Sequence, residues 1–146
     1  AEFEKMRLTT EKSGSLPVVF LLSIGDLAMR LARANFSANF FATAGFRIIN
    51  NMAYDNVREG IDAALKASAN IIVLCSSDEE YARLAPEAQE YLASLMPDQS
   101  SQPLLVIAGA PPCADDLRAK GITRFIHVRS NILETLIQFQ TELGII

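Results

Sequence analysis

Hydrophobic residues fall into short continuous runs, separated by longer stretches in which apolar and polar residues recur with a helical period. Five runs contain almost no polar alternation, namely residues 17–24, 46–50, 70–75, 103–109 and 124–128. Runs of this kind are typical of strands whose two sheet faces are both covered. The pattern therefore favours a parallel sheet over a sheet built from hairpins.

The stretches between the runs carry the start and stop signals of helices. Asn56, Ser77 and Asn131 are each followed three residues later by a glutamate, which is the spacing of an N-terminal capping box. Gly45 and Gly121 fall where a helix would end in a left-handed residue. Strand and helix thus alternate along the chain, and right-handed crossovers place helices on both faces of the sheet.

This order predicts an α/β fold, a flavodoxin-like doubly wound domain with a five-stranded parallel sheet in strand order 2-1-3-4-5. Such sheets bind ligands beyond the carboxyl ends of their strands, beside the first strand. The loops that would surround a ligand are therefore residues 23–29, 75–78, 109–113 and 127–131.

Composition and charge narrow the class of protein. The chain has 146 residues, half of them hydrophobic, which suits one domain with its own core. A net charge of −4 without a basic cluster argues against nucleic acid, and no apolar run reaches the ~18 residues of a membrane span. The charged, then Ser/Gly-containing N-terminus is unlike a signal peptide and indicates a linker. Two cysteines without a secretory signal indicate a reducing cytoplasm.

Most chemistries of this fold lack their residues. The loop after the first strand has one hydroxyl, where a flavin phosphate loop needs several, and Gly25 stands alone, where a dinucleotide site needs a glycine motif. The third strand does not end in an aspartate, so a phosphoacceptor site is missing, and no metal-ligand spacing is present.

Two alternatives remain open on the residues alone. A stand-alone enzyme using Cys75 or His127 would need those side chains close to each other or to a carboxylate. A small-ligand-sensing module would need an open pocket lined by Ser76, Ser77 and Asp26. Both Cys75 and His127 more commonly serve as packed structural residues at such positions.

Four segments together resemble a known family: "FFATAGFRIIN", "ANIIVLCSSDEEYARLAPE", "PLLVIAGAPP" and "DDLRAKGITRFIHVRSNILETL". They are similar to the C-terminal cobalamin-binding-type domain of methylmalonyl-CoA mutases, and most closely to the small subunit of the heterodimeric bacterial enzyme. The resemblance implies that residues 1–16 are a linker from a preceding, absent barrel domain. Residues 17–146 would be a degenerate cobalamin-binding-like domain.

The resemblance also implies what the chain lacks. Cobalamin-binding members carry Asp-x-His-x-x-Gly after the first strand, and matching Gly45-Phe46 to the family's Gly-Phe puts Ala28, Arg30 and Arg33 at those positions. No cofactor is then expected on this chain. The slot between the sheet and a helix, which holds the cofactor's nucleotide tail in the family, should be filled with side chains. By the resemblance, adenosylcobalamin in the complex lies on the large subunit, and this chain is a non-catalytic part of an isomerase that interconverts methylmalonyl-CoA and succinyl-CoA.

The helix after the first strand has two apolar faces. Counting ~100° per residue from Leu27, one sector should pack on the sheet, and it contains Leu27, Leu31, Ala34, Ala38, Phe41 and Ala42. The opposite sector contains the candidate interface residues Met29, Arg33, Phe36 and Phe40. Aromatic, Met and Arg side chains are enriched at protein interfaces. The pattern therefore predicts that this second face contacts the large subunit or the barrel domain of the same subunit.

Overall fold

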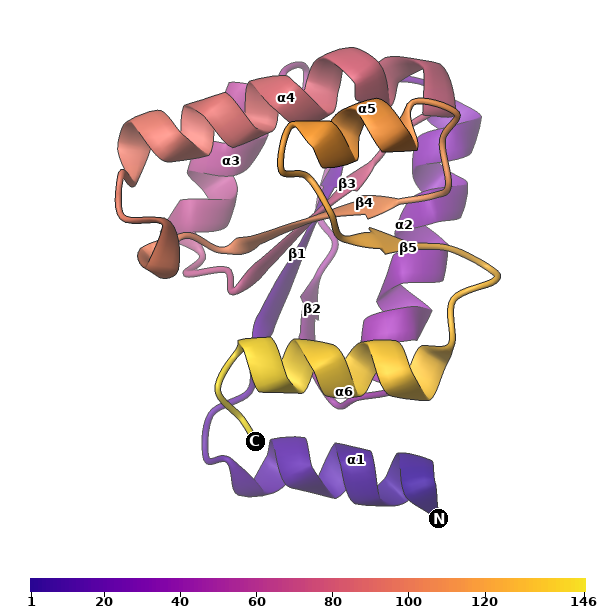
Figure 1. The fold of residues 1–146 in the computed structure, drawn as a ribbon, viewed down its shortest axis with the longest axis vertical. Helices are drawn as coiled ribbons and strands as arrows, with labels where there is room; N and C mark the ends of the chain where they lie inside the picture. The colour runs from indigo at the N-terminus through magenta and orange to yellow at the C-terminus, as the bar shows by residue number, and fades with distance from the viewer.

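The computed structural model describes all of residues 1–146 and has three main layers, with a parallel sheet between two layers of helices (Figure 1). The five strands lie in the order β2-β1-β3-β4-β5. Their bounds are β1 Val18–Ser23, β2 Arg47–Ile49, β3 Ile71–Cys75, β4 Leu104–Ala108 and β5 Phe125–Ile126. Each strand falls within one predicted apolar run, so the predicted fold class and strand order are confirmed.

The helices divide between the two faces of the sheet. On one face lie α2 (Leu27–Ala42) and α6 (Ile132–Glu142), and on the other lie α3 (Val57–Lys66), α4 (Asp78–Leu95) and α5 (Ala114–Ala119). Successive residues of β1 point to opposite faces, so Val19 and Leu21 enter one core cluster and Phe20 and Leu22 the other. A 3₁₀ turn, η1 (Gln99–Ser101), precedes β4. No helix combines the length and apolar character that crossing a bilayer requires.

Two of the three predicted helix caps form as expected. The Asn56 side chain accepts a hydrogen bond from the Glu59 N–H at 2.9 Å, and Asn131 accepts one from the Glu134 N–H at 3.0 Å. Ser77 precedes α4 as predicted, but it makes no side-chain cap. Its hydroxyl instead donates to the carboxylate of Glu80 at 2.7 Å, because a charged acceptor is the stronger partner.

The two predicted helix-terminating glycines are confirmed. Gly45 follows α2 with φ 78°, and Gly121 follows α5 with φ 88°. Both values lie in the left-handed region that side chains with a Cβ rarely adopt. These glycines let the chain leave each helix and turn towards the next strand.

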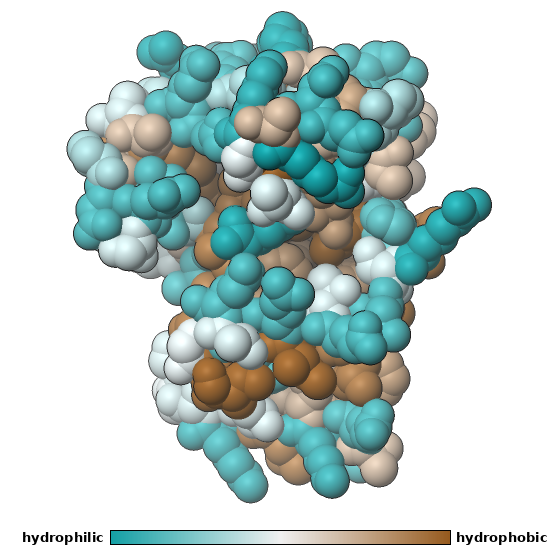
Figure 2. Space-filling view, in the orientation of Figure 1, coloured by the Kyte–Doolittle hydropathy of each residue, from teal (hydrophilic) through white to brown (hydrophobic).

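The N-terminal segment forms a helix, α1 (Glu2–Lys12), which packs on the outer side of α6 (Figure 1). The buried amide of Gln140 donates to the Met6 carbonyl at 2.8 Å and to the Thr10 hydroxyl at 2.9 Å. Hydrophobic side chains remain visible in this lower part of the molecule, where Figure 2 shows a brown band. The assignment of residues 1–16 as a linker to another domain stays a prediction.

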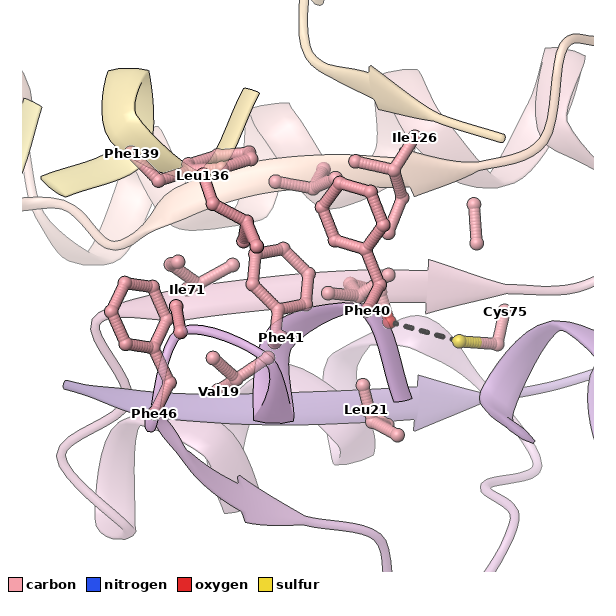
Figure 3. Close-up of a cluster of buried hydrophobic side chains, with 14 of the residues drawn as sticks. Val19, Leu21, Phe40, Phe41, Phe46, Ile71, Cys75, Ile126, Leu136 and Phe139 are labelled. Atoms are coloured by element: carbon pink, nitrogen blue, oxygen red, sulfur yellow. Dashed lines mark hydrogen bonds between the residues drawn. The ribbon is translucent and has the colours of Figure 1, made fainter. Parts of the chain in front are cut away.

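The orientation predicted for α2 is wrong in part. Ala34 and Phe41 are buried as predicted, but Leu27 is 60% exposed and Leu31 is 54% exposed. Phe40, placed by the sequence on the outer face, is 4% exposed and lies in the core beside Phe41 (Figure 3).

The physical reason is the position of a polar residue. The buried residues of α2 are Ala34, Ser37, Phe40 and Phe41. At ~100° per residue, that sector is centred close to Ser37, roughly 80° from the predicted centre. A wheel drawn from apolar residues alone could not place a buried serine at the middle of the packed face.

Candidate functional site

The loops that follow β1 and β3 meet at the carboxyl edge of the sheet, and the carboxylate of Glu80 joins them. Its Oε1 accepts hydrogen bonds from the Asp26 N–H at 2.9 Å, the Ser76 hydroxyl at 3.1 Å and the Ser77 hydroxyl at 2.7 Å. These hydrogen bonds hold the pKa of Glu80 below its ordinary value. The bond from the Asp26 N–H has the largest effect, and the bonds from the two hydroxyls also lower the pKa. The ionised carboxylate therefore holds the loops that follow β1 and β3 together.

Gly25 makes this arrangement possible. Its φ is 85°, and a Cβ at this position would overlap the carboxylate of Glu80. Directly after it, Asp26 caps α2 by accepting a hydrogen bond from the Met29 N–H at 3.0 Å. The β1–α2 loop is thus shaped around a side chain of α4 and leaves no opening between them at Gly25.

Arg33 fills the space between α2 and the ends of the central strands. Its guanidinium donates to the Ser76 carbonyl at 2.7 Å and forms an ion pair of 2.8 Å with Asp78. It also lies 5.6 Å from the centre of the Tyr81 ring. The Arg33 side chain is 16% exposed and that of Asp78 is 35% exposed, so the paired charges are partly shielded from water.

Gly109 bounds the same space from β4. Its φ is 136°, and a Cβ there would lie 3.0 Å from the Arg33 Cζ. The guanidinium therefore extends from α2 past the β3 loop to the backbone of the β4 loop. Arg33 stands at the position where the resemblance places the family's slot-opening glycine. Arg33 thus fills the space beside Gly109, and the assignment of this space to a former cofactor slot stays a prediction.

The resemblance compares two further positions of this chain with the cobalamin motif, and they hold Arg30 and Ala28. Arg30 turns back to its own loop and donates to the Gly25 carbonyl at 2.7 Å. A guanidinium has no free lone pair for a metal. Ala28, at the position of the family's aspartate, is exposed and has no hydrogen-bonding side chain.

An open space remains beside the filled one. It has a volume of about 610 Å³ and lies between α2 and the loops that follow β4 and β5. We call it the α2 hollow; it is lined by Ala32, Arg33, Phe36, Asp78, Gly109, Ala110, Ile126, His127, Val128 and Arg129. The pocket lining predicted for a ligand-sensing module, with Asp26, Ser76 and Ser77, is wrong because those residues are engaged with Glu80.

Cys75 and His127 do not form a catalytic pair. The Cys75 Sγ lies 3.9 Å from the Ser37 Oγ inside the core (Figure 3), and burial raises the pKa of this thiol to about 12. The His127 Nδ1 accepts a hydrogen bond from the Arg129 N–H at 3.2 Å within a turn. The contacts required by the stand-alone enzyme are therefore missing. The chain also contains no cluster of three or more His, Cys, Asp or Glu residues suited to a metal.

The candidate interface residues do not form one exposed surface. Phe40 is in the core and Arg33 is mostly buried, while Met29 and Phe36 are half-buried. For Phe40 the predicted exposure is therefore wrong. The helix α2 is rotated about its own axis relative to the prediction, so that the sector centred near Ser37 faces the sheet. The large apolar side chains of this helix that are exposed are Leu27 and Leu31, which the sequence had assigned to the core.

The fold and its crevice define a doubly wound, flavodoxin-like domain. At the carboxyl ends of β1 and β3, where such folds bind ligands, it holds its own Glu80 and Arg33 side chains. No protein-family model matches the chain. It is 56% identical, over 99% of its length, to part of the methylmalonyl-CoA mutase small subunit of Porphyromonas gingivalis. The match to the small subunit of Streptomyces virginiae is 32% identical over 58% of the chain. The match to the probable small subunit of Mycobacterium tuberculosis is 26% identical over 99% of the chain.

These comparisons confirm the resemblance to methylmalonyl-CoA mutase small subunits, for one segment of them. The chain spans 22% of the Porphyromonas protein, 14% of the Streptomyces protein and 23% of the Mycobacterium protein. It therefore corresponds to roughly a fifth of the length of these curated relatives.

Proposed function

We propose that the chain is a non-catalytic domain of a methylmalonyl-CoA mutase small subunit, and that it serves assembly with the large subunit instead of cofactor binding. The observation that carries this proposal is the position of Arg33, combined with 56% identity to a protein of that name. Its guanidinium occupies the space that a cofactor tail would need, and it is held there by Ser76 and Asp78.

The chemistry of the proposed complex belongs to its other parts. A radical interconversion of methylmalonyl-CoA and succinyl-CoA would be carried by adenosylcobalamin on the large subunit. This chain would contribute a folded surface and stability. The proposal also includes an N-terminal barrel domain of the same subunit, joined through residues 1–16, and a cytoplasmic location, which the two free cysteines support.

A titration of the chain with adenosylcobalamin, followed by visible absorbance, tests the cofactor part of this proposal. We expect that the spectrum of adenosylcobalamin does not convert to that of the form in which a histidine coordinates cobalt, because Arg30 has no lone pair to offer cobalt. The variant Arg30→His should also leave the spectrum unchanged, since Arg33 still fills the slot. A saturable spectral shift with the unaltered chain at micromolar concentration would contradict the proposal.

The assembly part rests on the exposed side chains at the start of α2. Leu27 and Leu31 lie one turn apart and are both more than half exposed, which suits a hydrophobic contact with a partner. The double change Leu27→Ser and Leu31→Ser should weaken binding of the small subunit to the large subunit in a co-purification experiment. Leu95→Ser is the matched control, because Leu95 is 46% exposed at the end of α4.

The two variants should give different results. If the α2 double variant binds the large subunit as well as the Leu95→Ser control does, the α2 surface is not the contact. Circular dichroism of both variants should show an unchanged fold, since neither change removes a buried side chain.

A further inference from the structure

We propose that the α2 hollow binds a small organic monoanion with an apolar body. This binding goes beyond the assembly role, because it needs no contact with another subunit. The hollow has a volume of about 610 Å³, within the ~300–1,000 Å³ typical of small-molecule sites. It lies at the carboxyl ends of β4 and β5, next to the space that Arg33 fills.

The walls of the hollow favour an apolar body for the ligand. Half of the lining residues are hydrophobic, and they come from α2, the loop after β4, the end of β5 and the loop after β5. Phe36 is contributed by α2, Ile126 by the end of β5, and Val128 by the loop that follows β5. A flat hydrocarbon ring would remove this apolar surface from water together with its own.

The charges around the hollow favour a single negative group. Arg33 and Asp78 form an ion pair and neutralise each other. Arg129 makes no salt bridge, so the lining carries one unpaired positive charge in a chain of net charge −4. A carboxylate placed near Arg129 could form a charge-assisted hydrogen bond with its guanidinium, because no carboxylate of the chain pairs with Arg129.

Uncharged donors lie at the same rim. The N–H groups of Ala110 and Val128 donate to no group within the chain. His127 uses Nδ1 to accept from the Arg129 N–H, which leaves Nε2 as the nitrogen available to a ligand. The residues of the rim thus include two backbone N–H groups without a partner and an imidazole, in addition to the guanidinium.

The filled neighbouring space limits the size of the ligand. A molecule that extended from the hollow towards β3 would have to displace the Arg33 guanidinium from Ser76 and Asp78. That displacement would break a partly buried ion pair and a hydrogen bond at once, which is costly. The proposed ligand is therefore a compact molecule, with one ring system and one anionic group, and not a long nucleotide-like tail.

Amide NMR spectra of the chain, recorded with increasing naphthalene carboxylate, test this proposal. We expect saturable shifts at Gly109, Ala110 and Val128 in the low millimolar range or below. The corresponding naphthalene carboxamide, which has the same ring without the charge, should bind more weakly. Acetate, which has the charge without the ring, should also bind more weakly.

Two rim variants and one control define the site. Arg129→Gln and Val128→Glu should each weaken binding of the carboxylate on the order of fivefold, because both make the rim less positive. Both residues are exposed, so the fold should survive. Arg47→Gln, an exposed arginine at the start of β2, should leave binding unchanged.

Three results would overturn the proposal. These are an absence of saturable shifts, equal binding of the carboxylate and the carboxamide, and an Arg129→Gln affinity equal to that of Arg47→Gln. None of them depends on cobalamin or on the large subunit, so failure here is distinguishable from failure of the proposed assembly role.

Discussion

Replacement of Phe40 by alanine tests the orientation of α2 directly. Phe40 is 4% exposed in a core cluster of 16 buried residues. Its ring centre lies 5.7 Å from that of Phe36 and 5.3 Å from that of Phe41. Phe40→Ala therefore removes almost a whole buried ring and two aromatic contacts.

The expected cost follows from this burial. Buried Phe→Ala changes cost about 3–5 kcal/mol of the free energy of unfolding. Phe40 belongs at the lower end of that range, because its neighbour Phe36 is only half-buried and can partly close the cavity. For 146 residues, an unfolding entropy of about 0.3 kcal/mol/K converts about 3 kcal/mol into a Tm decrease of about 10 °C.

Leu31→Ala is the matched control on the same helix. Leu31 is 54% exposed, so its replacement should change the free energy of unfolding by no more than about 0.5 kcal/mol and Tm by about 2 °C. Thermal unfolding followed by circular dichroism measures both variants. A larger decrease for Leu31→Ala than for Phe40→Ala would show that α2 packs as the apolar pattern alone predicted and that the structural reasoning is wrong.

Three further outcomes follow from single sites. Gly45→Val and Gly121→Val should each lower Tm by about 3 °C or more in thermal unfolding, because valine is strained at positive φ; unchanged values would place the caps elsewhere. At about pH 8 a thiol reagent should modify Cys113 but not Cys75 until denaturant is added, since burial keeps the Cys75 thiol protonated; two equivalents in the native state would contradict this. Glu80 has a lowered folded pKa, so its stabilisation is present above the unfolded value of about 4.5 and is lost as pH falls through the folded pKa. The Tm of Glu80→Gln should therefore fall less than that of the unaltered chain between about pH 6 and about pH 3.

The strands could be predicted from the sequence because both faces of the sheet are covered. Runs such as residues 70–75 are apolar at every position after the first, and β3 is buried from Ile71 to Cys75. The glycines after α2 and α5 could be predicted for a similarly local reason, since left-handed residues have few alternatives to glycine.

The site could be predicted only in outline. The sequence identified the loops beside β1 and β3, but the helical wheel placed Arg33 on an outer face. A long arginine side chain reaches a carbonyl more than forty residues away in the chain, Ser76, and no local pattern records that contact. The role of Glu80 was missed for the same reason, because its spacing from Ser77 was sufficient to suggest a helix cap.

The contact between Gln140 and α1 has a consequence for the order in which this domain is completed during synthesis. The amide of Gln140 binds Met6 and Thr10, residues separated from it by 134 and 130 positions. Within residues 1–146, α1 is therefore translated before the five strands, while the helix that holds it is translated after all of them. Until then α1 lacks its contacts with α6, and an isolated helix of 11 residues is marginal in water. Although α1 is translated before the strands, it is thus among the last elements of this domain to dock.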